Sequence, residues 1–479
     1  MNSTLAPVQP SPELPREAPA SSSRLSNLAG KLENKTAQIG VVGMGYVGLP
    51  LALLFARKSF LTSGFDIDPS KIEKLWRGES YIKHIPGASV AEQVEGQRFV
   101  PRADFASMSA MDAIIICVPT PLDKHREPDL SYVTNTAIEI RKHLRCGQLI
   151  VLESTTYPGT TDEVLLPIFE ETGLHCPVAT YTTDHQTVTS GATSEPDFFL
   201  AFSPEREDPG NKHFQNYEIP KVIGGVNGPS ALAVQALYQS AFQKTFMVSS
   251  SRAAEMSKLL ENIYRCVNIA MVNELKLLSM RMGIDIWEVI EAAKTKPFGF
   301  NAFFPGPGLG GHCIPIDPFY LTWKAREYEF PTRFIELAGE TNTAMPYHVV
   351  NALAEALDRN GKTLHGSKVL VLGVAYKRDI DDIRESPALK IMELLQSRGS
   401  IVAYHDPFVK RLGKTREYDF GMESTPLSGE TLHAYDCALI VTDHSCIDYE
   451  QVVRESSLVV DTRNATARVT ALREKIVRC

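Results

Sequence analysis

Residues 37–48 read AQIGVVGMGYVG, a short apolar run that leads into the pattern Gly-x-Gly-x-x-Gly. The run predicts a buried strand, and the apolar residues after the glycines predict a helix. In such a turn Gly43 permits the tight bend, Gly45 lets the backbone approach a pyrophosphate, and Gly48 allows close helix–strand packing. The free N–H groups of the helix N-terminus favour a phosphate. The stretch predicts a dinucleotide-binding α/β fold, although an ordinary glycine turn would have the same residues.

An acidic residue follows at the position where a dinucleotide site needs one. Asp66 ends the next run, residues 61–66. A carboxylate there can bind both ribose hydroxyls and repels a 2′-phosphate, which favours NAD over NADP. The sequence Asp-Ile-Asp-Pro at 66–69 is also compatible with an exposed turn.

The length and charge of the chain limit its class. Its 479 residues suffice for about three domains, at roughly 150 residues each. The net charge of −8, without a long basic run, argues against a nucleic-acid partner but permits a local pocket for an anion. The eight cysteines form no C-x-x-C pair and accompany no histidine cluster. We therefore expect reduced thiols in the cytoplasm, without a metal site or a disulfide framework.

One uncharged stretch, residues 36–56, is long enough to suggest a membrane span. It contains four glycines and Pro50, so a strand, a turn and a helix explain it better. No secretory signal is visible, and we expect no membrane association.

Short apolar runs recur at 113–118, 149–152, 198–202 and 221–223, with helical patterns between several of them. This alternation predicts a parallel sheet covered on both faces. Residues 252–282 form the longest helical pattern, which could bridge two α/β domains and supply a dimer surface. Further strands are expected at 368–373, 400–404, 437–442 and 458–461. The polar residues 176–196 predict a long surface loop.

The segment PGPGLGGHC at 305–313 carries the most chemical information. Gly308, Gly310 and Gly311 let the main chain approach a ligand closely. As a thiolate, Cys313 could attack an aldehyde carbon. A buried free cysteine behind a glycine loop explains the same residues equally well.

Together these segments resemble the nucleotide-sugar 6-dehydrogenases, the family that contains the UDP-glucose and UDP-N-acetylmannosamine dehydrogenases. The resemblance covers about residues 36–475. It is carried by GMGYVG at 43–48, CVPTP at 117–121, ESTTYPGTT at 153–161, SPER at 203–206, EMSKLLENIYRCVNIA at 255–270, GPGLGGHCIPIDP at 306–318, GVAYKRDIDDIRES at 373–386 and VVDTRN at 459–464.

This resemblance implies oxidation of a sugar C6 alcohol to a carboxylate with two NAD⁺, through a thiohemiacetal and a thioester on Cys313. The continuation IPIDPFY at 314–320 resembles the UDP-N-acetylglucosamine 6-dehydrogenase branch. UDP-N-acetylglucosamine is therefore the expected substrate, with UDP-N-acetylmannosamine and UDP-glucose as alternatives.

The resemblance also implies the site residues. The catalytic set is Cys313, Lys258, Asn262, Asp317, Glu205 and Thr155. The NAD-binding set is Gly43, Gly45, Tyr46, Val47, Gly48, Asp66, Lys71, Pro119, Thr120 and Thr155. The substrate-binding set is Glu205, Arg206, Lys258, Asn262, Gly310, Lys377 and Arg463.

Local chemistry is compatible with these roles without proving them. Lys258 and Asn262 are four residues apart, so they share a helix face and could stabilise oxyanion charge. The basic Lys377 and Arg463 suit an anionic diphosphate. Without the resemblance, a solvated helix face and two surface charges would explain the same residues.

The predicted fold is α/β, with two Rossmann-like parallel-sheet domains joined by a central helical domain with one long helix. The expected parts are a disordered tail (1–35), an NAD-binding domain (36–228), a helical dimerisation domain with the cysteine loop (229–345) and a UDP-binding domain (346–479). We expect a homodimer or higher homo-oligomer.

Two other functions fit the same layout. A two-electron hydroxyacid or hydroxyacyl dehydrogenase would need no nucleophilic Cys313. A nucleotide-sensing scaffold would not need Cys313, Lys258, Asn262 and Asp317 together. The cysteine loop argues against the first, and the complete set of four residues argues against the second.

Overall fold

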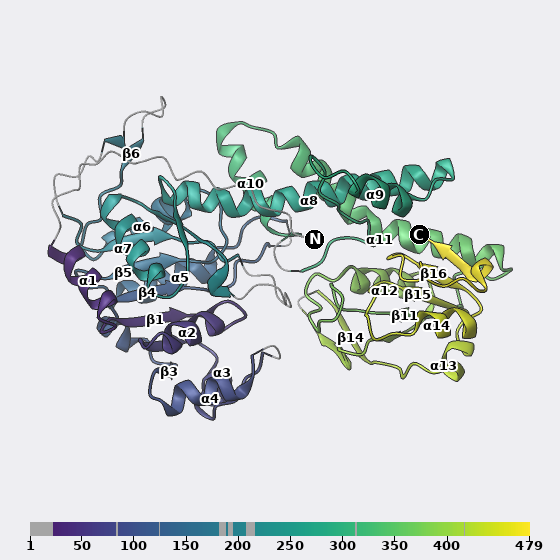
Figure 1. The fold of residues 1–479 in the computed structure, drawn as a ribbon, viewed down its shortest axis with the longest axis horizontal. Helices are drawn as coiled ribbons and strands as arrows, with labels where there is room; N and C mark the ends of the chain where they lie inside the picture. Colours follow the sequence, from purple (N-terminus) through teal and green to yellow (C-terminus); the bar gives the residue numbers. More distant parts are fainter. Residues whose placement is uncertain are drawn as a thin grey trace. The chain divides into compact units, whose positions relative to one another are not determined.

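The computed structural model describes residues 23–82, 85–123, 125–181, 188–189, 195–206, 216–311, 314–415 and 417–479. The chain divides after Leu260 into two compact units, here unit 1 and unit 2, each built around its own sheet (Figure 1). Within the described residues, no helix is long and apolar enough to cross a membrane.

Unit 1 contains an eight-stranded sheet of order β10-β9-β8-β5-β4-β1-β2-β3. Its strands are β1 (Gln38–Val42), β2 (Leu61–Phe65), β3 (Phe99–Arg102), β4 (Ala113–Ile116), β5 (Leu149–Leu152), β8 (Phe199–Phe202), β9 (Lys221–Gly225) and β10 (Thr245–Met247). Neighbouring strands are parallel except for β8 and β9, which run antiparallel. The order β3-β2-β1-β4-β5 is that of a dinucleotide-binding half.

Helices cover both faces of this sheet because successive strand residues point to opposite sides. In β4, Ala113 and Ile115 join a hydrophobic cluster with α1, α2 and α7, whereas Ile114 and Ile116 join a second cluster with α5 and α6. The helices of unit 1 are α1 (Ser23–Glu33), α2 (Gly48–Arg57), α3 (Pro69–Trp76), α4 (Gly87–Glu95), α5 (Ser131–Arg141), α6 (Leu166–Glu170) and α7 (Gly228–Gln239). The predicted buried parallel sheet is confirmed, apart from the antiparallel β8–β9 pair.

The prediction of a disordered tail for residues 1–35 is wrong from residue 23 onward. Helix α1 buries Leu28 and Leu32, which are four residues apart and face the core together. At its last turn Lys31 Nζ donates to Asp112 at 2.8 Å. Two buried leucines and one ion pair are too sparse a pattern to stand out after a Ser/Pro-rich segment. Residues 1–22 lie outside the described residues.

The predicted loop 176–196 also has more structure than expected. Thr180–Tyr181 (β6) pairs antiparallel with Val188–Thr189 (β7). Cys176 is buried and accepts a hydrogen bond from Asn227 Nδ2. Residues 182–187 and 190–194 lie outside the described residues.

Unit 2 has a five-stranded, wholly parallel sheet of order β12-β11-β15-β16-β17. Its strands are β11 (Lys368–Leu372), β12 (Ile401–His405), β15 (Cys437–Ile440), β16 (Val459–Asp461) and β17 (Ile476–Arg478), with a separate hairpin of β13 (Arg411–Lys414) and β14 (Asp419–Glu423). The helices are α9 (Ile286–Lys294), α10 (Asp317–Ala325), α11 (Arg333–Arg359), α12 (Pro387–Ser397), α13 (Gly429–His433) and α14 (Tyr449–Glu455). One hydrophobic cluster joins its sheet to α11 and α12, and another joins it to α13 and α14.

The long helix predicted over residues 252–282 is confirmed as α8 (Ser251–Met282). Its first ten residues belong to unit 1 and the rest to unit 2. The two parallel sheets and the long helix confirm the predicted fold class.

Candidate active site

Four predicted segments meet at one edge of the sheet of unit 1. Strands β8, β5, β4 and β1 are parallel neighbours, so the segments after their carboxyl ends lie along the same edge. These segments are 203–206, 153–161, 117–121 and 43–48. In open α/β sheets this edge is where nucleotide ligands bind.

The glycine turn has the geometry that a pyrophosphate requires. Gly43 has φ +94°, and a Cβ there would lie 2.6 Å from the carbonyl oxygen of Cys117. A Cβ on Gly48 would lie 1.9 Å from the carbonyl oxygen of Gly43, so only glycine allows α2 to begin here. A Cβ on Gly45, in contrast, would meet no atom of the described residues within 4 Å. The space at Gly45 fits a phosphate group, and Tyr46 and Val47 continue the turn into α2.

Asp66 is held at the end of β2 as the sequence predicts. The carboxylate accepts hydrogen bonds from Met44 N at 2.9 Å, Asp68 N at 3.0 Å and Lys71 Nζ at 3.0 Å. The side chain is only 6% exposed, whereas Lys71 is 35% exposed. The Tyr81 hydroxyl donates to the carbonyl oxygen of Met44, so both the backbone N–H and the carbonyl of Met44 are held. The arrangement fits a ribose beside Asp66 and Lys71.

The next two segments are positioned by backbone contacts. Cys117 N donates to Val42 O at 2.8 Å, and Ser154 Oγ donates to Val118 O at 2.7 Å, which ties the segments after β1, β4 and β5 together. Pro119 is exposed, Thr120 is buried and Thr155 is half-buried. These three predicted cofactor residues therefore lie on the same edge as the glycine turn.

Glu205 follows β8 and lies beside a buried ion pair. Lys221 Nζ is 2.9 Å from Glu153 Oε2 and 3.9 Å from Glu205 Oε2. Arg206 donates to Pro220 O at 2.8 Å, a contact that holds the backbone of the segment before β9. Glu205 therefore lies at the predicted edge of the sheet, whereas the guanidinium of Arg206 is bonded to the backbone of the protein.

The start of α8 is anchored to the segment after β5. The buried Glu255 carboxylate accepts hydrogen bonds from Gly159 N at 2.6 Å, Thr161 N at 2.9 Å and Thr161 Oγ1 at 2.7 Å. Burial raises the pKa of Glu255 to about 8, despite these bonds. Arg252 adds an ion pair to Asp162 at 2.7 Å. One turn beyond Glu255, Lys258 is buried with 5% exposure.

In unit 2 two of the predicted catalytic residues contact each other. Asn262 of α8 donates through Nδ2 to Asp317, the first residue of α10, and accepts a hydrogen bond from Arg265. Asn262 is fully buried, and Asp317 is 3% exposed. Cys313 lies outside the described residues, so its placement is not part of this geometry.

The glycine loop before Cys313 packs against the segments that follow β11 and β16 in the same unit. Gly311 N donates to Arg384 O at 3.0 Å, and a Cβ on Gly310 would lie 2.6 Å from Tyr376 Cβ. A Cβ on Gly306 would lie 2.5 Å from Arg463 Nη1. The loop therefore runs beside the predicted substrate residue Arg463, and Gly310 adjoins the residue that precedes Lys377.

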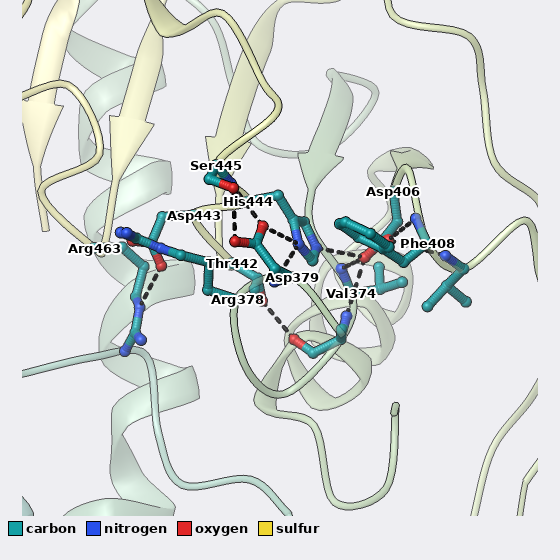
Figure 2. Close-up of polar contacts among 12 residues, drawn as sticks. Val374, Arg378, Asp379, Asp406, Phe408, Thr442, Asp443, His444, Ser445 and Arg463 are labelled. Carbon is teal, nitrogen blue, oxygen red and sulfur yellow. Dashed lines mark hydrogen bonds and ion pairs between the residues drawn. The ribbon is translucent and has the colours of Figure 1, made fainter. Parts of the chain in front are cut away.

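Figure 2 shows the polar network at the carboxyl ends of β11, β12 and β15. Asp443 pairs with Arg378 and, at 3.3 Å, with Arg463 Nε. His444 accepts a hydrogen bond at Nδ1 from Asp379 N at 3.0 Å, so its proton is on Nε2 and is donated to Asp406 at 3.0 Å. Burial alone would raise the pKa of Asp406, but His444 and backbone amides lower it below its usual range. The network orients Arg463.

Several polar residues at these sites were not predicted. They are Tyr81, Glu153, Lys221, Glu255, Asp406, Asp443 and His444. A charged residue at the end of a buried apolar run was a usable signal for Glu153, Lys221 and Asp406. Glu255 sits in a helical pattern in which a buried carboxylate is indistinguishable from an exposed one.

The fold and the glycine turn define a dinucleotide-binding protein. The sequence matches all three domain models of the UDP-glucose/GDP-mannose dehydrogenase family: the NAD-binding domain at residues 37–242, the central domain at 252–344 and the UDP-binding domain at 370–468. The chain belongs to this family, and the predicted enzyme class and NAD cofactor are confirmed.

Its relatives act on different sugars. It is 34% identical to UDP-N-acetyl-D-glucosamine 6-dehydrogenase of Pseudomonas aeruginosa over 86% of this chain and 91% of that protein. It is equally 34% identical to UDP-N-acetyl-D-mannosamine dehydrogenase of Escherichia coli strain K12, over 85% of this chain and 94% of that protein. The structure of UDP-D-ManNAc dehydrogenase from Pyrococcus horikoshii is similar with a TM-score of 0.77 at 30% identity, over 89% of this chain and 96% of that one. The chain is thus a nucleotide-sugar 6-dehydrogenase, a class that leaves the sugar open.

Proposed function

We propose that this enzyme oxidises the C6 alcohol of UDP-N-acetylglucosamine to the uronic acid in two NAD-dependent steps, with UDP-N-acetylmannosamine and UDP-glucose as alternative substrates. The observation that supports the chemistry most is the hydrogen bond between Asn262 and Asp317, which come from separate segments and are both predicted to be catalytic. The choice of sugar rests on the segment 314–320.

In this proposal each residue has a defined task. The Cys313 thiolate attacks the C6 aldehyde, and the resulting thiohemiacetal is oxidised to a thioester. Lys258 and Asn262 stabilise the negative charge on oxygen at C6, and Thr155 lies near the reacting carbon. Asp317 and Glu205 handle the protons of the hydrolytic water. Bound NAD⁺, held by the glycine turn, Asp66 and Lys71, would accept the hydride at each oxidation.

The UDP group is assigned to unit 2. Lys377 and Arg463 are basic side chains at the carboxyl edge of its sheet, and Asp443 fixes the guanidinium of Arg463. Gly310 lets the loop before Cys313 pass close to this edge. The division into domains at 36–228, 229–345 and 346–479, and a cytoplasmic location, are part of the proposal.

A homodimer is also part of the proposal. In unit 2, α8 exposes Met271, Leu275, Leu278 and Met282, with exposed fractions of 41–62%. Their spacing of three and four residues places them in one apolar stripe. Light scattering should give a dimer or a larger assembly, and Leu275→Glu with Leu278→Glu should shift the mass towards the monomer. A wild-type monomer under assay conditions would contradict this.

The decisive experiment measures NADH formed from a limiting UDP-sugar with excess NAD⁺. We expect about two NADH per sugar, with UDP-N-acetylglucosamine preferred over UDP-N-acetylmannosamine, UDP-N-acetylgalactosamine and UDP-glucose. Cys313→Ser should abolish net turnover and retain NAD binding, while the exposed Cys146→Ser serves as the matched control with unchanged rate. One NADH per sugar, or full activity of Cys313→Ser, would contradict the covalent route.

A further inference from the structure

In unit 1, one buried lysine is shared by two glutamates. Lys221, at the start of β9, is 4% exposed. Its Nζ donates to Glu153 Oε2 at 2.9 Å and lies 3.9 Å from Glu205 Oε2. The ammonium also lies over the rings of Tyr238 and Phe242, at 5.1 and 5.5 Å from their centroids. The mechanism proposed above uses only Glu205 of this cluster.

Burying these three charged groups costs free energy, so packing alone does not explain why they lie together. A buried ion pair is often no more stable than apolar residues of the same volume, and here one cation faces two carboxylates. Tyr238 OH donates to the other oxygen of Glu153, so Glu153 is fixed at both oxygens. Burial alone would lower the pKa of Lys221, but the Glu153 and Glu205 carboxylates outweigh it and raise that pKa. The lysine therefore stays charged beside Glu205.

We propose that Lys221 is a positioning residue that, held by Glu153 and Tyr238, keeps a positive charge beside the Glu205 carboxylate and fixes that carboxylate for the hydrolysis of the thioester. This role rests on the proposed function. In that step the water oxygen bonds to the thioester carbonyl carbon and the water proton passes to Glu205. The carbon–sulfur bond breaks, and its electron pair leaves on the Cys313 sulfur.

The charges around Lys221 predict a signature that a purely structural role lacks. The titratable groups that face it are Glu153 after β5, Glu205 after β8, Tyr238 on α7 and Cys117 after β4. Without the ammonium, the two carboxylates would face each other unneutralised, and one would retain a proton to higher pH. With Glu153 made neutral, the ammonium of Lys221 would interact with the Glu205 carboxylate alone, which favours the charged form of that carboxylate. The two substitutions should therefore act in opposite directions.

The test follows release of the acid product in a single turnover, across pH, with the full-length enzyme, saturating NAD⁺ and the preferred UDP-sugar. In Lys221→Met the acid limb of the rate profile should move up by about one pH unit, with a rate roughly tenfold lower on that limb. In Glu153→Gln the limb should move down, and Lys221→Arg should restore most of the wild-type profile. Lys244→Met, an exposed lysine before β10, is the matched control with an unchanged profile.

The outcomes separate this role from the function on which it rests. Unmoved limbs, shifts in the same direction, or a loss that is equal at every pH would overturn the role of Lys221. If Lys221→Met does not fold, the downward shift in Glu153→Gln and the rescue in Lys221→Arg still decide. A wild-type enzyme that forms no NADH from any UDP-sugar would overturn the proposed function itself.

Discussion

The two sheets of this enzyme share one local arrangement, a glycine turn after the first strand and a carboxylate after the second, but the two carboxylates have different surroundings. In unit 1, β1 is followed directly by Gly43 with φ +94°, and in unit 2, β11 is followed directly by Gly373 with φ +81°. Each second strand is followed by a carboxylate that accepts a backbone N–H of the first turn: Asp66 from Met44 at 2.9 Å, and Asp406 from Val374 at 2.7 Å.

The surroundings of the two carboxylates differ. Asp66 has three donors, and one of them is the partly exposed Lys71. Among the described residues Asp406 has five donors, none of them an exposed side chain: His444 and the backbone amides of Val374, Ala375, Phe408 and Val409. A carboxylate at a glycine turn that can still accept hydrogen bonds, such as Asp66, is able to bind a ligand. A carboxylate whose lone pairs are all used, such as Asp406, stabilises the fold instead, and a ligand at that turn must be bound by other side chains such as Arg463.

Replacing these two carboxylates gives the largest expected contrast. Asp406→Ala leaves five donors without their acceptor, four of them in buried contacts, and we expect a loss of about 4 kcal/mol in the free energy of unfolding. Asp66→Ala should cost less than half as much but abolish the thermal stabilisation by NAD. Calorimetry with and without NAD measures both. Equal losses of stability, or an NAD effect lost in Asp406→Ala as well, would remove the distinction.

The glycines sharpen the same contrast. A Cβ at Gly373 would lie 2.3 Å from the carbonyl oxygen of Thr442, whereas one at Gly45 would meet no atom within 4 Å in the part of the chain that the structure describes. Gly373→Ala should therefore destabilise by about 2 kcal/mol through strain and the close contact. Gly45→Ala should unfold like the wild type and weaken NAD binding at least about tenfold, because the methyl group fills the space assigned to the pyrophosphate. Chemical denaturation and NAD titration give the two quantities, and unchanged NAD affinity in Gly45→Ala would place the pyrophosphate elsewhere.

Much of this contrast could not be predicted from the sequence. The pattern of residues 37–48 predicts both the turn and its ligand, because three glycines at fixed spacing have a local steric cause. The segment 368–373 predicts a strand, but nothing local distinguishes Asp406, with five internal donors, from a second ribose-binding carboxylate. The donors come from residues up to 38 positions away, as His444 does, and only the folded sheet brings them together. For the same reason Glu153 and Lys221 could be identified as unusual but not as a pair.

Two buried carboxyl groups, Glu255 in unit 1 and Asp406 in unit 2, should contribute to stability with opposite dependence on pH. Glu255 of unit 1 has a pKa of about 8 in the folded state, against about 4.3 unfolded, so the native state retains a proton that the unfolded chain releases. This contribution lowers stability as the pH rises from about 4.3 to 8. The lowered pKa of Asp406 stabilises unit 2 above the unfolded value of about 3.9, and this is lost as the pH falls through the folded value.

Urea unfolding at several pH values tests this difference. Glu255→Gln should remove the Glu255 contribution, so its stability relative to the wild type should rise between pH 5 and pH 8. Asp406→Asn should instead be less stable than the wild type near neutral pH, and this difference in the free energy of unfolding should disappear only in acid, as the pH falls through the folded pKa of Asp406. Glu163→Gln, a half-exposed neighbour in the same segment as Thr161, is a suitable control for Glu255→Gln. A difference in the free energy of unfolding between Glu255→Gln and the wild type that does not change with pH would mean that Glu255 is ionised in the native state.

The smallest expected effect concerns Lys71, the partly exposed partner in the Asp66 site. Its ion pair with Asp66 spans 3.0 Å, but the lysine side chain is 35% exposed, so the pair should add less than about 1 kcal/mol to stability. Lys71→Ala should leave unfolding nearly unchanged and weaken NAD binding only a few-fold, because Asp66 keeps both backbone donors. Removal of the cation should also make any binding of NADP still weaker, since the 2′-phosphate would then face Asp66 alone. NAD and NADP titrations of the same variant measure this, and a variant that binds NADP better than the wild type does would show that Lys71 is not the group facing the ribose.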